Sequence, residues 1–559
     1  MGPSELFLHN GKIITLDGDS SVREAIHVRN GRIAAVGDGA DLMPGVSPEA
    51  KRIDLGGRSV TPGFFDSHAH MDREGLRPRG GIDIAGIDTI DGIVQAIAEV
   101  ALHTPKGTWT VVMPMGDPPH GYISRPEELR DGRYPDRHDL DRATKDHPVY
   151  IRAPWGWWSR PPFPAVANTM ALQRAGIDAD TVPPFRTEML TNGLGEPTGV
   201  FLERNFTPIL EYTLFRVVPR FNEIDRLESV RRGSATYARL GTTTIYEGHG
   251  LTPNLLNAFR DAHETGDLRL RTWAPLSVPT AAFDDARIEE MLFHWADRIS
   301  GRGSGDDMLR YEGICLDVGD PTLADIISCH YPYEQWAGHF YQSLPHDRLV
   351  RIGTVAARLG IRVNCLVCYD LERVLRAYEE IDRQVSIRDQ RWTAVHVVDA
   401  SDEQIERMKR LGLVATVTPN FMYMAEDRFG LDKLRDRGIP IRRLLDAGVP
   451  VTLSSDNVPP SMIWTMWEAL ARWDADSDTR LGDSELTREE ALRISTQSGH
   501  HLIFNDHQAG SLEPGKLADM VVLDEDPLTC DEDALRDLEP TWTFVGGHAT
   551  HSPEPEPST

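Results

Sequence analysis

The sequence predicts an α/β protein in which short strands alternate with helices through the middle of the chain. Short apolar runs separated by helix-like stretches recur between residues 242 and 454, and further strand-like runs stand at both ends of the chain. Residues that can bind a metal ion directly follow several of these runs. In parallel α/β folds, such strand ends carry the functional residues.

Composition limits the possible classes of protein. The chain has 559 residues, which favours one large domain with a smaller one, and its net charge of −27 argues against nucleic acid as a partner. No apolar run approaches the roughly 20 residues that span a bilayer. Five cysteines do not make a disulfide framework. We therefore expect a cytoplasmic protein with no nucleic-acid or membrane partner.

The sequence predicts β-strands at both ends of the chain. Residues 5–60 contain alternating runs interrupted by Asn10-Gly11 and Asn30-Gly31, and each of these pairs predicts a hairpin turn. These strands need a partner sheet in order to bury one face. The strand-like runs at 520–524 and 541–547 can supply it, so the termini are expected to form one discontinuous β-sandwich.

The middle of the chain supplies the candidate barrel strands. They are residues 242–246, 313–316, 362–364, 392–396, 414–417 and 450–454. Residues 106–220 do not show this alternation of strands and helices and are rich in Pro, Trp and Arg. They are predicted to form an inserted subdomain. Its tryptophans either shape the substrate site or only pack within the subdomain. The Pro- and Glu-rich tail after residue 550 is predicted to be disordered.

The clearest candidate for chemistry is the segment Val60–His70, which ends in Asp66-Ser67-His68-Ala69-His70. On a strand, residues two apart point to the same face, so His68 and His70 can bind one metal ion. Imidazole suits zinc, iron, nickel or copper.

This segment resembles the first metal motif of the amidohydrolase superfamily. Residues 510–523 resemble the return strand of that superfamily, and residues 195–203 and 391–419 resemble its YtcJ-like branch, which includes N-substituted formamide deformylase. The resemblance implies a (β/α)8 TIM-type barrel with a small discontinuous β-sandwich. The implied domains are a sandwich from residues 1–60 and 506–550, a barrel over 61–505 with an insertion at about 106–220, and a tail at 551–559.

The resemblance also implies site residues. His396, at the end of a predicted strand, matches a metal-binding histidine. Asp456, in Ser454-Ser455-Asp456-Asn457, matches the aspartate that binds metal and acts as general base. A carboxylate in reach of the attacking water can take its proton and deliver it to a leaving amine.

Two positions depart from the family pattern. Cys315 stands where a bridging lysine is usual, and it either binds or bridges a metal as a thiolate or is a small buried hydrophobe. Asn364 stands at a missing histidine and is a poor zinc ligand. Glu247 and His249, at an earlier strand end, either replace a lost ligand, act as acid and base, or are structural. Cys365-x-x-Cys368 lacks the setting of a redox pair.

Together these features predict a metal-dependent hydrolase that cleaves a C–N bond in an amide, formamide, carbamate or cyclic amide. Asp456 would be the base, and His396 a ligand or a stabiliser of the oxyanion. One divalent metal per chain is expected, with zinc favoured over iron or manganese. The alternatives are a non-hydrolytic lyase or redox enzyme on the same barrel and a catalytically silent ligand-binding protein. The resemblance further implies a small-molecule substrate and a homodimer.

Overall fold

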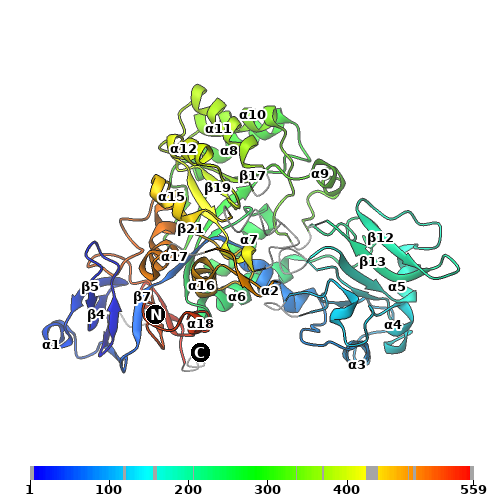
Figure 1. The fold of residues 1–559 in the computed structure, drawn as a ribbon, viewed down its shortest axis with the longest axis horizontal. Coiled ribbons are helices and arrows are strands. Elements are labelled where there is room, and N and C mark those ends of the chain that lie inside the picture. Colours follow the sequence, from blue (N-terminus) through cyan, green and yellow to red (C-terminus); the bar gives the residue numbers. More distant parts are fainter. Residues whose placement is uncertain are drawn as a thin grey trace. The chain divides into compact units, whose positions relative to one another are not determined.

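The computed structural model describes residues 5–116, 121–154, 160–205, 207–334, 337–367, 370–423, 438–475, 477–482 and 486–553 (Figure 1). The chain divides into two compact units. The first comprises Met1–Glu74, Val230–Gly319 and Gly338–Thr559, and the second comprises Gly75–Ser229 and Asp320–Ala337.

Eight parallel strands among the described residues form the barrel of the first unit. In spatial order they are β8 (Phe64–Ala69), β14 (Thr242–Glu247), β15 (Arg271–Ser277), β17 (Leu309–Asp317), β18 (Val363–Leu366), β19 (Thr393–Val395), β20 (Val414–Val417) and β21 (Val451–Leu453). Each strand pairs in parallel with the next one in this order. The predicted barrel is therefore confirmed.

Helices follow the barrel strands and cover the outside of the barrel. They include α7 (Pro253–Glu264), α8 (Asp285–Ile299), α10 (His346–Arg358), α11 (Leu371–Gln384), α12 (Asp402–Arg410), α15 (Ile441–Ala447), α16 (Met462–Ala471) and α17 (Arg488–Leu502). In α11 the buried residues Leu371, Val374, Leu375, Tyr378 and Ile381 recur every three or four positions, which is the pattern of a helix with one apolar face. Helix α12 begins at Ser401 with the capping box that its sequence predicts.

Strand β15 is the barrel strand that sequence patterns did not reveal. Pro275 interrupts its apolar run, and proline within a run argues against a strand because it has no N–H for the ladder. In the structure, the pairing of β15 with β17 shifts register between Ala274 and Leu276. Pro275 therefore lies where the ladder is already irregular.

The first and last barrel strands meet through side chains. Ser67 Oγ on β8 donates to the Leu453 carbonyl of β21 at 2.6 Å, and Asp66 Oδ1 accepts from the Ser455 N–H at 3.0 Å. The Asp456 N–H donates to the His68 carbonyl at 3.2 Å. We call these contacts the β8–β21 seam. The seam joins the two strand ends that carry the histidine pair and Asp456.

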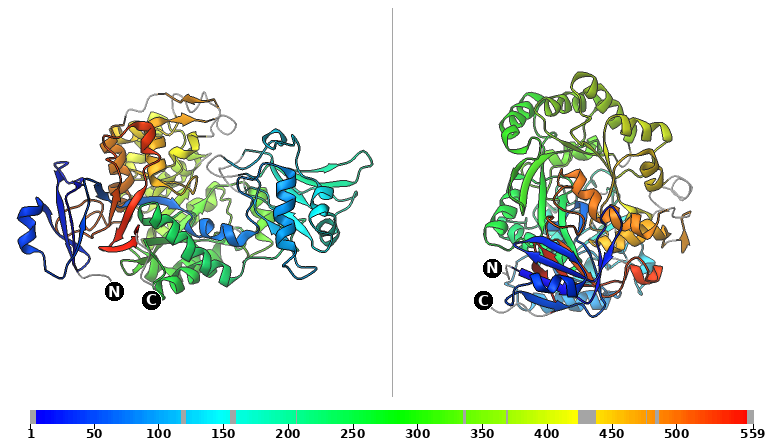
Figure 2. Two further views of the ribbon diagram at one scale, coloured as in Figure 1. Left: turned by 90° about the horizontal axis from the view of Figure 1, so that it is seen from below. Right: turned by 90° about the vertical axis from the view of Figure 1, so that its left-hand side faces the viewer.

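Strands from both termini form two packed sheets in the first unit, and the blue and red strands lie side by side in Figure 2. One sheet has the order β5-β4-β1-β6, and the other β26-β25-β24-β7-β2-β3. Their strands are β1 (Glu5–His9), β2 (Lys12–Ile14), β3 (Val22–Arg23), β4 (Ala25–Arg29), β5 (Arg32–Gly37), β6 (Lys51–Asp54), β7 (Ser59–Pro62), β24 (Met520–Leu523), β25 (Pro540–Val545) and β26 (His548–His551). One apolar core is shared by the two sheets, and it includes Leu8, Val28, Val60, Met520 and Phe544.

The two Asn-Gly pairs have different outcomes. Asn30-Gly31 joins β4 to β5 in the predicted hairpin, with Arg29 opposite Arg32. The hairpin predicted at Asn10-Gly11 is wrong, because β1 and β2 belong to different sheets: β1 runs parallel to β6, and β2 runs parallel to β7. The turn instead carries the chain from one sheet of the sandwich to the other.

A buried ion pair ties the sandwich to the barrel within the first unit. Arg271 at the start of β15 donates from Nε to Asp519 Oδ2 at 2.7 Å and from Nη2 to Asp519 Oδ1 at 3.0 Å. Asp519 Oδ1 also accepts from the Gly546 N–H at 2.7 Å. This explains the acid that precedes β24: it compensates a buried guanidinium rather than taking part in chemistry.

The second unit is built on a five-stranded sheet. Its order is β12 (Thr187–Thr191), β13 (Pro197–Glu203), β11 (Phe163–Ala167), β10 (Val149–Ile151) and β9 (Thr110–Val112), and it carries α3 (Ile90–Ala101), α4 (Arg137–Ala143) and α5 (Thr169–Ala175). On β10, Val149 and Ile151 join one apolar core and Tyr150 joins another, so both faces of this sheet are covered. The predicted insertion falls within this unit. Its Trp155, Trp157 and Trp158 lie outside the described residues.

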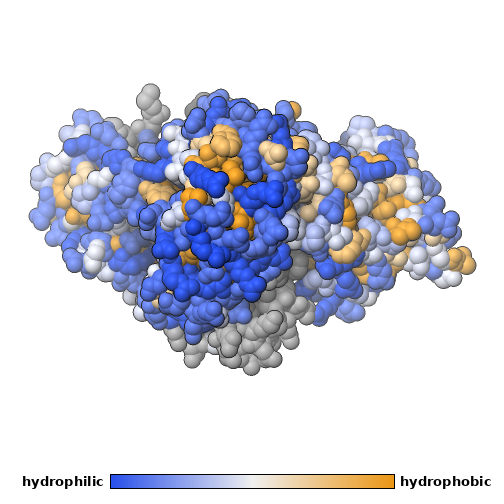
Figure 3. All heavy atoms as spheres, turned by 90° about the horizontal axis from the view of Figure 1, so that it is seen from above, coloured by the Kyte–Doolittle hydropathy of each residue, from blue (hydrophilic) through white to orange (hydrophobic). Residues whose placement is uncertain are grey.

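The part of the chain that the structure describes contains no helix both long and apolar enough to cross a bilayer. Most of the surface in Figure 3 is hydrophilic. The large apolar side chains that are most exposed are Leu102, Val182 and Leu194.

We expect Asp519→Asn to lower the free energy of unfolding by about 3–5 kcal/mol, because it leaves the buried Arg271 guanidinium without its counter-charge. The measurement is urea denaturation followed by circular dichroism. Glu264→Gln is the control: it removes an exposed ion pair with Arg260 at 3.8 Å and should change stability by less than about 1 kcal/mol. Equal effects of the two substitutions would contradict the structural role of the buried pair.

Candidate metal centre

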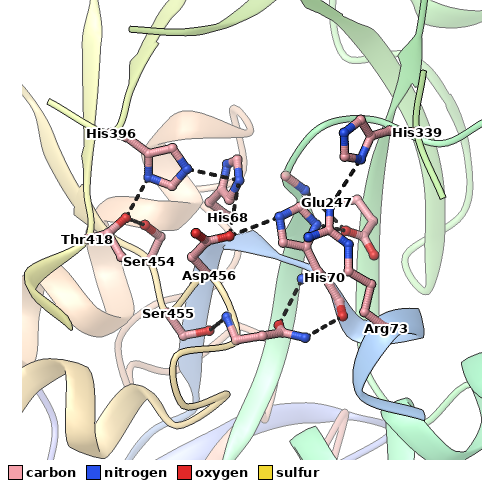
Figure 4. A network of polar contacts seen from close by, with 12 residues as sticks. His68, His70, Arg73, Glu247, His339, His396, Thr418, Ser454, Ser455 and Asp456 are labelled. Carbon is pink, nitrogen blue, oxygen red and sulfur yellow. Dashed lines mark hydrogen bonds and ion pairs between the residues drawn. The ribbon is translucent and has the colours of Figure 1, made fainter. Parts of the chain in front are cut away.

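Four predicted residues meet at the carboxyl ends of the barrel strands, around the β8–β21 seam (Figure 4). His68 lies on β8, His70 directly follows it, His396 follows β19, and Asp456 follows β21. All four side chains are buried. Since parallel strands place their carboxyl ends at one rim, residues nearly 400 positions apart become neighbours.

One group of possible metal donors consists of His68, His70 and Asp456, which each offer a ligand atom within 4.8 Å of the others. Asp456 Oδ1 lies 3.0 Å from His70 Nε2 and 3.7 Å from His68 Nε2. His70 Nε2 nevertheless makes no hydrogen bond, and His68 Nδ1 is also buried without one. Buried polar atoms usually have a partner, so these atoms fit a site that binds a metal ion.

A second group consists of His68, His249 and His396, again with ligand atoms within 4.8 Å of one another. His396 Nε2 lies 3.2 Å from His68 Nε2. The two groups share His68, so the five residues surround the same imidazole.

The protonation of these side chains suits a metal ion. Burial lowers the pKa of His68, His70 and His249 well below the usual value, and the charges of neighbouring basic groups lower it further. Burial also lowers the pKa of His396 to about 3. The imidazoles are therefore neutral at pH 7, and neutral imidazole is the form that binds a metal. Imidazole and carboxylate donors fit a divalent ion of the zinc type.

A chain of hydrogen bonds fixes the tautomer of His396. Its Nδ1 lies 2.7 Å from Thr418 Oγ1, which lies 2.7 Å from Ser454 Oγ, and Ser454 Oγ lies 3.1 Å from the Val417 carbonyl. Ser454 has one proton, and only donation to the carbonyl makes all three contacts hydrogen bonds. Thr418 then donates to Ser454 and accepts from His396 Nδ1–H. The Nε2 atom of His396 is left with a free lone pair that faces the site.

The backbone around the site is held in uncommon conformations. His396, Asp456 and Asn457 all have positive φ, of 60°, 52° and 61°. Asn457 also holds His70 on both sides: its Nδ2 donates to the His70 carbonyl at 2.7 Å, and its Oδ1 accepts from the His70 N–H at 3.1 Å. Such conformations persist only where surrounding contacts impose them, and they concentrate at functional sites.

Asp66, the acid of the first motif, acts within the seam. It accepts from the Ser455 N–H, from the Ser455 hydroxyl and from the His68 N–H. Burial raises the pKa of Asp66 to about 6, and these hydrogen bonds oppose the rise. Asp66 thus orients the backbone of His68 and is not in either group of donors.

Glu247 lies at the end of β14, with Oε2 3.8 Å from His70 Nδ1. Burial raises the pKa of Glu247 well above its usual value, and the nearby charge of Asp72 adds to this. The protonated form of this carboxyl group is therefore favoured. It can donate a proton but is a weak metal donor in that form.

Cys315 and Asn364 lie beside the site, and among the described residues Cys315 does not belong to a group of metal donors. Burial raises the pKa of the Cys315 thiol well above its usual value, so it is not a thiolate. Asn364 Nδ2 donates to the Gly248 carbonyl at 2.8 Å. Cys365 is a buried free thiol, and Cys368 lies outside the described residues.

Two further residues reach the site without any signal in the sequence. His339 stacks against His249 with ring centroids 4.1 Å apart, and Arg73 Nη2 lies 3.1 Å from His339 Nδ1. His339 lies outside the regular strands and helices. Hydrogen bonds from the Thr252 N–H to the Gly338 carbonyl and from the Phe340 N–H to Ser277 Oγ hold its segment against the barrel rim. Only the folded chain brings it there.

Comparison with known proteins agrees with this geometry. Residues 51–551 match the model of the Amidohydrolase family, so the chain belongs to that family. It is 27% identical to N-substituted formamide deformylase of Arthrobacter pascens over 97% of both chains, and 26% identical to the putative amidohydrolase YtcJ of Bacillus subtilis over 97% of this chain and 98% of that protein. An uncharacterised metal-dependent hydrolase of Pyrococcus horikoshii has the same fold, with a TM-score of 0.66 at 21% identity over 95% of this chain and 99% of that one.

We expect Gly248→Ala to weaken the binding of divalent metal, because a Cβ atom at position 248 would lie 2.5 Å from His68 Nε2 and displace the ring. The measurement is the Zn²⁺ content of the purified protein after dialysis against a weak chelator. Gly18→Ala is the control, since a Cβ atom there meets nothing within 4 Å. An unchanged metal content in Gly248→Ala would contradict the expectation that the missing Cβ of Gly248 leaves the room that the His68 ring needs to bind metal.

Proposed function

We propose that the protein is a metal-dependent hydrolase that cleaves a C–N bond in an amide, formamide, carbamate or cyclic amide. The observation that carries this proposal is the meeting of neutral imidazoles with Asp456 at the carboxyl rim of a barrel. The likeness to a deformylase over nearly the whole chain supports the same reaction class.

The donor set proposed for the ion is His68, His70 and Asp456, with His396 as a further ligand. One ion per chain, zinc in preference to iron or manganese, is consistent with His68 being shared by both groups of donors. When bound, such an ion lowers the pKa of water to about 7 and polarises the substrate carbonyl. The free lone pair of His396 favours a ligand role over donation to the oxyanion.

Asp456 is the proposed general base. Its N–H is fixed to the His68 carbonyl by the seam, and its carboxylate lies among the imidazoles. It would accept a proton from the attacking water and pass that proton to the leaving nitrogen, which turns a poor leaving group into a neutral amine. The protonated Glu247 is a second group that can supply a proton at this rim.

The non-hydrolytic alternative is motivated by the absent Lys and His of the family pattern and by the unusual Cys315, Glu247 and His249. In the structure Cys315 is a buried, protonated thiol whose Sγ donates to the Gly248 carbonyl at 3.7 Å. Thiolates rather than thiols react and bind metals, so no observation favours a redox role.

We further propose that the protein is a cytoplasmic homodimer. The four described cysteines, Cys315, Cys329, Cys365 and Cys530, are all free, which suits a reducing compartment. The homodimer is proposed from the family resemblance. Light scattering during size-exclusion chromatography of the purified protein tests it.

We expect the purified protein to contain about one zinc ion per chain and to hydrolyse one member of a panel of formamides, amides and carbamates. Asp456→Asn should lower kcat at least about 100-fold, because the base is lost. The exposed Asp389→Asn variant is the control and should keep full activity. Full activity in Asp456→Asn would rule out the base, and a protein that never binds metal would rule out the mechanism.

We expect Thr418→Val to weaken metal binding by about 10–100-fold, because the partner that keeps the proton on His396 Nδ1 is lost. Zinc affinity is measured by competition with a chromogenic chelator. Thr416→Val is the control: it removes a buried hydroxyl of β20 that has no hydrogen-bond partner. Equal affinity in Thr418→Val and the wild type would contradict the tautomer assigned to His396.

A further inference from the structure

We propose that His249 is a ligand of the metal ion and that Asn364 and Cys315 serve as a clamp that holds the turn carrying His249. This inference rests on the proposed function only in requiring that the site bind a divalent ion. It assigns the ligand to the turn after β14 and gives a positioning role to Cys315 of β17 and Asn364 of β18.

The turn consists of Glu247, Gly248 and His249. The Gly248 N–H donates to the Ala69 carbonyl at 2.9 Å, which attaches the turn to the strand that carries His68 and His70. A Cβ atom on Gly248 would lie 2.5–2.7 Å from three atoms of the His68 ring. Only glycine therefore allows the turn to pass this close to a metal donor.

Two side chains from neighbouring strands converge on the Gly248 carbonyl. Asn364 Nδ2 donates to it at 2.8 Å, and Cys315 Sγ donates to it at 3.7 Å. Cys315 and Asn364 are register partners in the pairing of β17 with β18, so their side chains reach the same point together. We call this arrangement the Gly248 clamp.

Both polar atoms of the Asn364 side chain make hydrogen bonds to the protein. While its Nδ2 binds Gly248, its Oδ1 accepts from Thr393 Oγ1 at 2.5 Å. Thr393 is the register partner of Asn364 on β19. The amide is thus held at both ends by neighbouring strands, and its orientation toward the Gly248 carbonyl is fixed.

The clamp determines the position of His249. The Gly248 carbonyl and the His249 N–H belong to one rigid peptide plane, so holding the carbonyl also orients the backbone of His249. The imidazole then lies with its centroid 5.1 Å from that of His68 and 5.0 Å from that of His70. His339 stacks on it at 4.1 Å and limits its rotation. A ligand held in this way loses little conformational entropy on binding.

The test is titration of the metal-free protein with Co²⁺, followed by absorbance and calorimetry, without any substrate. His249→Ala should bind Co²⁺ at least about 100-fold more weakly than the wild type, because a ligand is lost. Asn364→Leu should bind about 10–100-fold more weakly, because it removes an outer-shell contact while leaving every ligand in place. The controls are His500→Gln, a buried histidine outside both groups of donors, and Thr416→Val, and both should stay within about threefold of the wild type.

Each outcome has a distinct meaning. If His249→Ala binds Co²⁺ as the wild type does, His249 is not a ligand and the inference fails, while the proposed function stands. If His249→Ala is weakened and Asn364→Leu is not, the clamp is overturned. If the wild type itself binds no Co²⁺, the proposed function and the inference both fail.

A second measurement uses the wild type alone and does not depend on the folding of any variant. Carbethoxylation by diethylpyrocarbonate is followed by mass spectrometry with and without Co²⁺. Protection of His249 by the metal supports the inference, and modification at an unchanged rate overturns it. His501, a partly exposed histidine outside both groups of donors, is the internal control and should react equally in both conditions.

Discussion

The candidate site depends on the closure of the barrel between its first and last strands. The two strand ends are brought together by contacts in which Ser67 of β8 binds the Leu453 carbonyl of β21 and Asp66 binds the N–H of Ser455, two residues further along the chain. The closing hydrogen bond from Asp456 to the His68 carbonyl is itself part of the site. The same contacts therefore complete the fold and set the distance between the carboxylate and the histidines, and stability and chemistry are coupled at this point.

The rim of a barrel allows side chains on different strands to serve the same site. The ends of all strands face one centre, so a residue from a different strand can reach a given point. Asn364 and Cys315, at positions where the family pattern has metal-binding residues, both contact the Gly248 carbonyl. His249, one residue further, is among the possible donors. If His249 is a ligand, as proposed, then Cys315 of β17, Asn364 of β18 and His249 after β14 act together in one arrangement.

Several acids in the motifs have architectural rather than chemical roles. Asp66 accepts three hydrogen bonds in the seam, and Asp519 balances the buried charge of Arg271. An acid next to a histidine motif is easily taken for a ligand. A carboxylate that already accepts several hydrogen bonds from the protein has a structural role, whereas a ligand keeps an oxygen free for the metal. The number of these hydrogen bonds can be counted only in the folded chain.

The sequence by itself determined the class of fold, most barrel strands, and the pairs His68–His70 and His396–Asp456 as candidates, because these rest on local patterns: alternation, strand ends and short motifs. It did not reveal β15, since Pro275 hides the strand, and it predicted a hairpin at Asn10-Gly11, since the turn signal does not say which sheet the next strand joins. Only the tertiary structure decided the relation of Asn364, Gly248 and His249, the tautomer of His396 and the presence of His339. These depend on which strand ends meet at the rim, and local propensity carries no information about contacts between residues that are distant along the chain.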